Sequence, residues 1–409
     1  MKKNIFYSVG ICLIAAGLFA ALRFSMAAGN VPWFSGRLEI DGSSYINGML
    51  SIAQSKDFLN LQDIYHSPGY QIYLGLLYRL DPAPQRIFLT VKVVAWVLYV
   101  LSVVIVYLFG ARFLGWRAGL MAAVFLALSN KFHIYANLIQ YETLLGFLIL
   151  CHLFLLAVWR AEKPWKGSLV PVLAGLLAAA IVLVQVRYLL LVPAGCLCFY
   201  LRARASQEFS LRKALAPVGA YLLPFLIIVG FWSVHHSLRE GQVILVSKGS
   251  SFRFQAGNNP NAKGYSWPYP VIVEPSGFSF ILRRPAQFLN LVAQRLMYFM
   301  DIKKDGWSMP LPFSEFAAGS RAPLIEKVFY LMSLFALLGG IIVKGGSGAE
   351  GPSAAAPLCL LLTFAAGVAA PLLIFSSSRF SVPLLPVIFL LQARFFDSLA
   401  GRFKTSRSD

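Results

Sequence analysis

The sequence predicts an all-α polytopic membrane protein with about ten transmembrane helices and two large extracytoplasmic loops. Of the 409 residues, 58% are hydrophobic and only 13% are charged, which is about half the charge of a soluble domain. The apolar residues come in blocks of about 17–25, the length needed to cross roughly 30 Å of hydrocarbon. Lysine and arginine concentrate in the short loops and tails of one side, which orients the spans with both termini in the cytoplasm.

The predicted spans follow these blocks in chain order. The first, 5–27, comes after Lys2 and Lys3 and is longer than a usual signal-peptide core, so we expect an uncleaved anchor. The run 168–201 is too long for one crossing at 1.5 Å per residue, so it divides at Arg187 into two short spans. The other spans are expected at 86–109, 117–134, 141–159, 214–235, 323–344, 354–375 and 380–397.

The two large loops, 28–84 and 236–321, are expected on the same outer side of a single membrane domain that covers 1–409. The second loop contains the amphipathic segment 280–300, whose three arginines predict that it lies along the membrane interface. Candidate residues from distant parts of the chain therefore share one face of the membrane.

The net charge of +19 does not indicate a nucleic-acid partner, because the basic residues form no single patch and no nucleic-acid motif accompanies them. Beside apolar spans, such charge anchors to anionic lipid headgroups. All five cysteines lie in apolar segments, so no disulfide framework is expected. The chain also lacks a Walker loop, a GxGxxG motif and zinc-ligand spacing, which leaves nucleotide-driven transport without support.

Carboxylates and a histidine at predicted outer positions are candidates for chemistry. Asp41, just beyond the first span, fits a general base or metal-assisting carboxylate, or alternatively a helix N-cap. His66 precedes the Pro-Gly turn and either lines a pocket or is an ordinary loop histidine. Glu142, next to Tyr141, begins an apolar span, where a carboxylate is costly unless it is paired or wet. The alternative for Glu142 is an interfacial acid that reaches water.

Two arginines and two asparagines complete the set of candidates. Arg187 interrupts an apolar run and Arg379 lies at a span junction. A guanidinium can bind two phosphate oxygens at once, although both arginines could instead snorkel to the interface. The amides of Asn258 and Asn259 suit sugar hydroxyls, or they mark an exposed turn.

The order of these features resembles the GT-C superfamily of membrane glycosyltransferases, and most closely its protein O-mannosyltransferase and lipid A aminoarabinose transferase group. The matching features cover most of the chain. They are Asp41 with Tyr45, His66 with Pro68, Arg187, the segment GNNPNAKG (257–264) and the segment SSSRFSVPLLP (376–386).

This resemblance implies a polyprenyl- or dolichyl-phosphate sugar donor and a reaction at the outer membrane face with inversion at the anomeric carbon. Asp41 would then deprotonate the acceptor hydroxyl, while Arg379, with Arg187 as a second candidate, would hold the donor phosphate. Tyr45, Tyr141 and the other polar residues named above would contact substrate.

The likeness also has a departure, because Gly42 follows Asp41 where many relatives have a second acid. That weakens the case for a shared acid pair or metal, so no cofactor is assigned and a divalent metal is the open alternative.

The acceptor would be a lipid, a glycan or a protein, and the likeness favours a bacterial inner membrane with the site facing the periplasm. A transporter or flippase, or a polymerase of polyprenyl-linked glycans, is the competing interpretation. Transport favours charged residues deep in several spans, whereas this chain concentrates its polar groups in two outer loops.

Overall fold

The computed structural model describes residues 40–59, 61, 64–80, 82, 87–159, 164–204, 210–264, 277–303, 322–342, 355–374 and 376–405. Throughout these residues the regular secondary structure is helical and contains no strand. The predicted first span, 5–27, lies outside the described residues. The expected all-α fold is therefore confirmed over the part of the chain that can be described.

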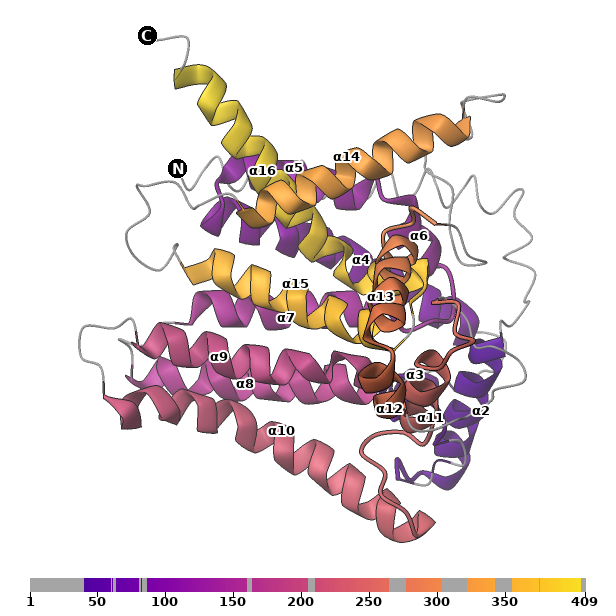
Figure 1. The fold of residues 1–409 in the computed structure, drawn as a ribbon. Helices are drawn as coiled ribbons and strands as arrows, with labels where there is room; N and C mark the ends of the chain where they lie inside the picture. The colour runs from indigo at the N-terminus through magenta and orange to yellow at the C-terminus, as the bar shows by residue number, and fades with distance from the viewer. Residues whose placement is uncertain are drawn as a thin grey trace.

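Apolar helices stacked in layers form the body of the molecule (Figure 1). They are α4 (Ile87–Phe113), α5 (Trp116–Ala127), α7 (Glu142–Val158), α8 (Pro164–Val184), α9 (Leu191–Arg204), α10 (Leu211–Glu240), α14 (Ala322–Ile342), α15 (Ala355–Leu373) and α16 (Leu385–Thr405). Five helical segments of the described residues are long and apolar enough to cross a membrane, and the others are shorter apolar helices. The chain is an integral membrane protein.

Close backbone approaches hold neighbouring helices of the body together. A Cβ on Gly110 of α4 would lie 2.4 Å from the Cα of Gly119 in α5, and one on Gly175 of α8 would lie 2.0 Å from a carbonyl oxygen of α10. Small residues at such crossings allow the van der Waals packing that replaces the hydrophobic effect between helices in lipid. His152 and Tyr221 add a buried hydrogen bond of 3.1 Å between α7 and α10.

The long apolar run 168–201 divides at Arg187, as its length predicts. Helix α8 ends at Val184, the 3₁₀ helix η2 (Val186–Leu190) follows, and α9 then begins. The predicted span 117–134 is wrong as a single helix, because α5 ends at Ala127 and a separate helix, α6 (Asn130–Ala136), follows. The cause is Ser129, whose hydroxyl accepts the backbone N–H of Phe132 at 3.3 Å and so caps α6.

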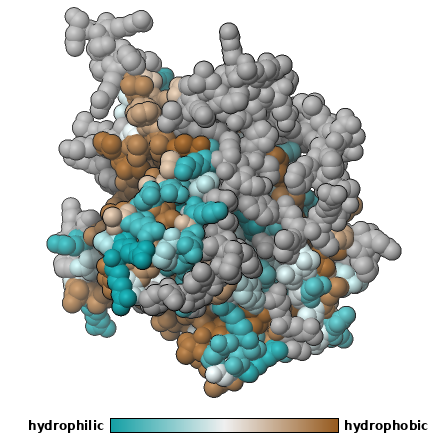
Figure 2. All heavy atoms as spheres, turned by 45° about the vertical axis from the view of Figure 1, so that its right-hand side comes forward, coloured by the Kyte–Doolittle hydropathy of each residue, from teal (hydrophilic) through white to brown (hydrophobic). Residues whose placement is uncertain are grey.

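Short helices gather at one end of the body, at the right of Figure 1, which we call the site end. They are α2 (Ile40–Ser55), α3 (Pro68–Leu80), α6, α11 (Gly249–Gly257), α12 (Gly277–Arg283) and α13 (Pro285–Phe299). Figure 2 brings this end forward and shows hydrophilic residues on it, with hydrophobic ones at its margins. The segments predicted as large loops are thus mainly helical where they are described, and they meet at the site end.

Candidate functional site

Two 3₁₀ helices at the site end each present an arginine. Arg187 lies in η2, and Arg379 lies in η3 (Ser378–Leu384), which precedes α16. The hydroxyl of Ser377 accepts the backbone N–H of Arg379 at 3.4 Å and so caps the start of η3. Because η2 and η3 both connect apolar helices, their arginines lie where the bundle ends.

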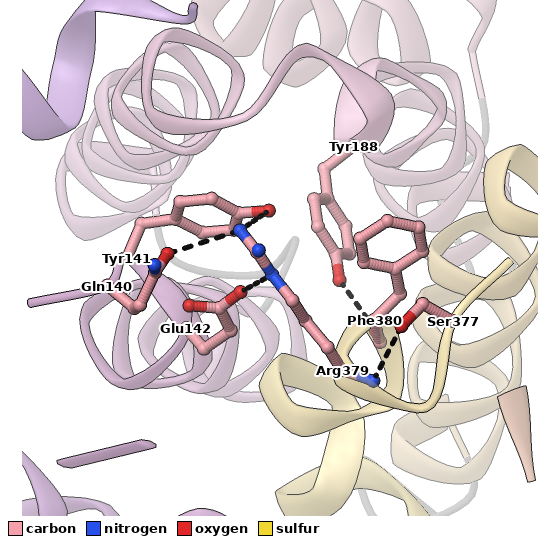
Figure 3. A network of polar contacts seen from close by, with 7 residues as sticks. All are labelled: Gln140, Tyr141, Glu142, Tyr188, Ser377, Arg379 and Phe380. Atoms are coloured by element: carbon pink, nitrogen blue, oxygen red, sulfur yellow. Dashed lines mark hydrogen bonds and ion pairs between the residues drawn. The ribbon is translucent and has the colours of Figure 1, made fainter. Parts of the chain in front are cut away.

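Arg379 forms a buried ion pair with Glu142 at the start of α7. Its Nε donates to Glu142 Oε1 at 2.6 Å, and its terminal nitrogen Nη2 donates to Gln140 Oε1 at 3.2 Å and to the Tyr141 hydroxyl at 3.3 Å. In Figure 3 the Arg379 side chain extends from η3 toward the start of α7, where its guanidinium contacts these three residues. The structure therefore pairs Glu142, and complete burial excludes the alternative of an interfacial acid that reaches water.

Arg187 lies against the residue that follows Arg379. Its guanidinium carbon is 3.4 Å from the centre of the Phe380 ring, a cation–π contact. The neighbouring Tyr188 donates its hydroxyl to the Phe380 carbonyl oxygen at 3.4 Å, as Figure 3 shows. These contacts hold η2 and η3 together and bring the two arginines to one place, although 192 positions separate Tyr188 from Phe380.

A third arginine, Arg253 of α11, joins this group, and the sequence interpretation missed it. Its guanidinium lies 5.3 Å from the ring centre of Tyr65, and its charge acts on Arg187, as does that of Arg379. Backbone hydrogen bonds from Lys248 to Ile64 (2.9 Å) and from Gly249 to Tyr65 (3.3 Å) hold the start of α11 in this position. Nothing in the local sequence of α11 distinguishes this arginine from an ordinary loop residue.

Aromatic side chains pack between the N-terminal half of α2 and the arginines Arg187, Arg253 and Arg379. The Tyr45 ring contacts those of His66, Tyr70 and Tyr141 with centroid separations of 5.6, 5.0 and 6.2 Å. Tyr45 lies one helical turn after Asp41, whose backbone belongs to the first turn of α2 but whose side chain is not described. The cluster fixes this helix against Tyr141, which itself contacts Arg379.

Burial keeps the phenols of this cluster neutral. Desolvation raises the pKa of Tyr70 well above its usual value, with smaller contributions from the neighbouring Tyr73 and Glu142. Burial likewise raises the pKa of Tyr73 to about 12. Neutral hydroxyls donate and accept hydrogen bonds without adding negative charge beside the arginines.

Asn258 and Asn259 do not face the arginine group as free amides. Both are buried. Asn258 Nδ2 donates to the carbonyl oxygens of Phe254 at 3.0 Å and Leu373 at 2.8 Å. Asn259 Nδ2 donates to Ala256, and its Oδ1 accepts the backbone N–H of Asn261 at 2.9 Å. Internal partners occupy these amides, which support the turn that ends α11. Their expected contact with sugar hydroxyls stays a prediction.

A second, partly buried ion pair contacts η3. Lys131 of α6 is paired with Asp301, which follows α13, and donates to the Ser381 hydroxyl at 2.8 Å. Asp301 has a left-handed backbone, with φ of 59°, which costs free energy for a residue other than glycine. The pairing joins α6, α13 and η3 and so fixes η3 close to Arg379.

The described residues contain no group of three or more histidine, cysteine, aspartate or glutamate side chains that could hold a metal ion. The side chain of Asp41 lies outside that description. A divalent metal stays a prediction.

Comparison with solved structures finds the same fold in membrane proteins. ArnT from Cupriavidus metallidurans, bound to undecaprenyl phosphate, matches with a TM-score of 0.53 and 12% identity over 97% of this chain and 60% of its own. The oligosaccharyltransferase AglB from Archaeoglobus fulgidus, in complex with an inhibitory peptide and a dolichol-phosphate, matches with a TM-score of 0.51 and 12% identity. That match covers 100% of this chain and 51% of AglB.

The chain thus spans between about half and three fifths of the length of these two proteins. No protein-family model matches the sequence, and no curated protein matches it. At this level of identity the likeness establishes the fold.

Proposed function

We propose that this membrane protein, which has the fold of the GT-C glycosyltransferases, transfers a sugar from a polyprenyl-phosphate donor to an acceptor hydroxyl. The observation that carries the proposal is that Arg187 lies on the ring of Phe380, next to Arg379, while Arg253 lies against Tyr65. The ring of Tyr65 in turn contacts His66, which packs on Tyr45 of α2. Cationic groups suit a phosphate, and we assign proton transfer to Asp41, whose backbone lies one helical turn before Tyr45. The solved structures with bound dolichol-phosphate and undecaprenyl phosphate support a lipid-phosphate donor.

In this proposal Arg187 and Arg253 bind the donor phosphate. Arg379 was the first candidate from the sequence, but its Nε and Nη2 already serve Glu142, Gln140 and Tyr141. We therefore assign Arg379 to the wall of the site, where it keeps Tyr141 and Glu142 in place. Arg187 has its guanidinium face on Phe380, and a planar guanidinium matches two phosphate oxygens through the N–H groups at its edge.

The reaction is a displacement at the anomeric carbon. The acceptor hydroxyl oxygen forms the new glycosidic bond while its proton passes to the Asp41 carboxylate. The bond between the anomeric carbon and the phosphate oxygen breaks, and its electron pair remains on the lipid phosphate. Preorganised arginines stabilise this developing charge without reorganisation. Attack opposite the leaving group inverts the anomeric configuration.

In this proposal the lipid-linked donor reaches the site from the membrane that surrounds the helix bundle. The polyprenyl chain lies in the membrane beside the apolar helices, while its phosphate reaches the polar site end. We assign this end to the periplasmic face of a bacterial inner membrane, in accordance with the distribution of basic residues in the sequence. The acceptor is a hydroxyl of a lipid, a glycan or a protein.

The proposal is tested by native mass spectrometry of the gently purified protein titrated with undecaprenyl phosphate. We expect a specific one-to-one complex, and we expect Arg253→Gln and Arg187→Gln to weaken it about tenfold or more, since each removes a charged hydrogen-bond partner. Arg284→Gln is the matched control, because Arg284 is an exposed arginine of the same predicted loop.

Equal binding by all variants would contradict the phosphate site. A protein that binds the lipid phosphate, and translocates a labelled polyprenyl-linked glycan across vesicle membranes without transferring sugar, would support the transporter interpretation instead. Sugar transfer to an added acceptor, measured with the same preparation, separates these outcomes.

A further inference from the structure

Arg295 of α13 is a completely buried arginine outside the arginine group described above. Its Nη1 donates to Asn258 Oδ1 at 3.2 Å and to the Leu372 carbonyl oxygen at 2.9 Å, and its Nη2 donates to the Gly257 carbonyl oxygen at 2.5 Å. The segment 280–300 is predicted to lie along the membrane interface, and Arg295 belongs to the face of α13 that is turned into the protein. Its partners are neutral oxygens of three segments that are distant in sequence.

Burial of this cation is costly and therefore informative. Desolvation lowers the pKa of Arg295 to about 10. No described carboxylate pairs with it, so its charge is balanced by carbonyl oxygens alone. One of these belongs to the last turn of α15, where carbonyl groups lack partners within the helix and carry partial negative charge. A leucine or methionine would fill the same space with a smaller desolvation penalty. The arginine therefore matters for the hydrogen bonds that it donates to separate segments.

The connections join the end of α11 to the end of α15. Gly257 and Asn258 end α11, while Leu372 and Leu373 end α15. A Cβ on Gly257 would lie 1.8 Å from the Ile374 carbonyl oxygen, so the two backbones are in contact. Asn258 donates to Leu373 at 2.8 Å while its oxygen accepts from Arg295. Arg295 therefore completes the joint between the two helix ends.

Each side of this joint carries one arginine of the site. Arg253 lies one turn before Gly257 in α11, and Arg379 follows the end of α15 through the segment that starts η3. That segment is held in turn by a hydrogen bond of 2.9 Å from the Ser376 N–H to the Gly264 carbonyl oxygen. Any displacement of α11 from α15 changes the separation of Arg253 and Arg379.

We propose that Arg295 is a positioning residue that sets the distance between Arg253 on α11 and the η3 arginine, and so shapes the phosphate site without touching the phosphate. The proposal rests on the function proposed above. It predicts that the contribution of Arg295 to phosphate binding depends on Arg253, because Arg295 acts through it.

The test is a double-mutant cycle on undecaprenyl phosphate affinity, measured by native mass spectrometry with the full-length protein. We expect Arg295→Gln to weaken binding about tenfold, and Arg295→Lys to restore part of the loss. In the Arg253→Gln background, Arg295→Gln should cause little further loss, since residues that act as a unit are non-additive. Additive losses, or wild-type affinity in Arg295→Gln, would overturn the proposal.

A distance measurement keeps this proposal separate from the phosphate assignment. Spin labels at Phe252 of α11 and Phe231 of α10, both exposed positions, report the place of α11 on the bundle once the five native cysteines are replaced. We expect Arg295→Gln to shift or broaden the distance distribution and Gln294→Ala, at its half-buried neighbour, to leave it unchanged. Arg295→Gln could move α11 while Arg253→Gln still binds undecaprenyl phosphate with wild-type affinity. That result would contradict the phosphate role of Arg253 but support the role of Arg295 in joining α11 to α15. An unmoved α11 overturns the joint itself.

Discussion

Arg379 Nε lies 2.6 Å from Glu142 Oε1, and both side chains are buried at the point where η3 meets the start of α7. These residues are 237 positions apart in the sequence. The pair joins the beginning of one apolar helix to the connection between two others, and it holds Tyr141 within hydrogen-bond distance of the same guanidinium. The stability and geometry of the site end both depend on this pair.

Removing the charge of Glu142 should destabilise the protein strongly. Glu142→Gln leaves Arg379 buried without its counter-ion, and breaking such a pair costs about 3–5 kcal/mol. We expect a marked fall in the unfolding temperature measured in detergent by intrinsic fluorescence. The double variant Glu142→Gln with Arg379→Gln should recover part of the loss, since it removes the uncompensated charge.

Glu240→Gln is the matched control for this measurement. Its carboxylate pairs with Lys248 near the surface, where an ion pair contributes roughly 0–1 kcal/mol. If Glu142→Gln lowers the unfolding temperature no more than the control does, the buried pair is not important for stability.

Asp41→Asn should abolish sugar transfer and leave the fold intact. Loss of a general base lowers the rate by roughly 10²–10⁴-fold. Asp41 is the second residue of α2 and so not its N-cap. Asparagine keeps the size of the side chain but cannot take up the proton, so this variant tests the base without removing the side chain. Transfer is measured with a radiolabelled polyprenyl-phosphate sugar, and undecaprenyl phosphate binding should stay at the wild-type level.

Asp57→Asn provides the control for that experiment, because Asp57 is an exposed acid near the end of the same helix, whose Oδ1 accepts the Leu59 N–H. Full turnover in Asp41→Asn would show that another group takes the proton.

Replacing Phe380 should weaken lipid-phosphate binding through Arg187. Phe380→Leu removes the ring face on which the guanidinium lies, a contact of about 0.5–2 kcal/mol. Without it Arg187 loses its fixed orientation, and we expect about fivefold weaker binding of undecaprenyl phosphate. The matched substitution Phe278→Leu concerns an exposed ring on α12 and should change nothing.

A salt titration distinguishes orientation from general damage. Phe380→Leu keeps all charges, so its affinity should fall with ionic strength as steeply as that of the wild type, whereas Arg187→Gln should show a shallower dependence. If Phe380→Leu binds undecaprenyl phosphate with wild-type affinity, the Phe380 ring does not orient Arg187 for phosphate binding.

The sequence by itself determined the class of the protein and most of its spans. Blocks of apolar residues long enough for a bilayer must be helical, because lipid offers no partner for free backbone groups. The length of 168–201 also sufficed to place the break at Arg187. The break at Ser129 was missed because a capping hydroxyl inside an apolar run is a weak local signal compared with hydrophobicity.

The sequence also identified Glu142 and Arg379 as residues that need an explanation, because charge is costly inside apolar segments. Only the tertiary structure decided that they pair with each other. It also placed Arg253 against Tyr65 and buried Arg295 between the ends of α11 and α15. An arginine in a polar connecting segment carries no local sign of its role, since its partners lie on helices far away in the chain. Ion pairs and helix joints are long-range contacts, and only packing determines which of the available charges meet.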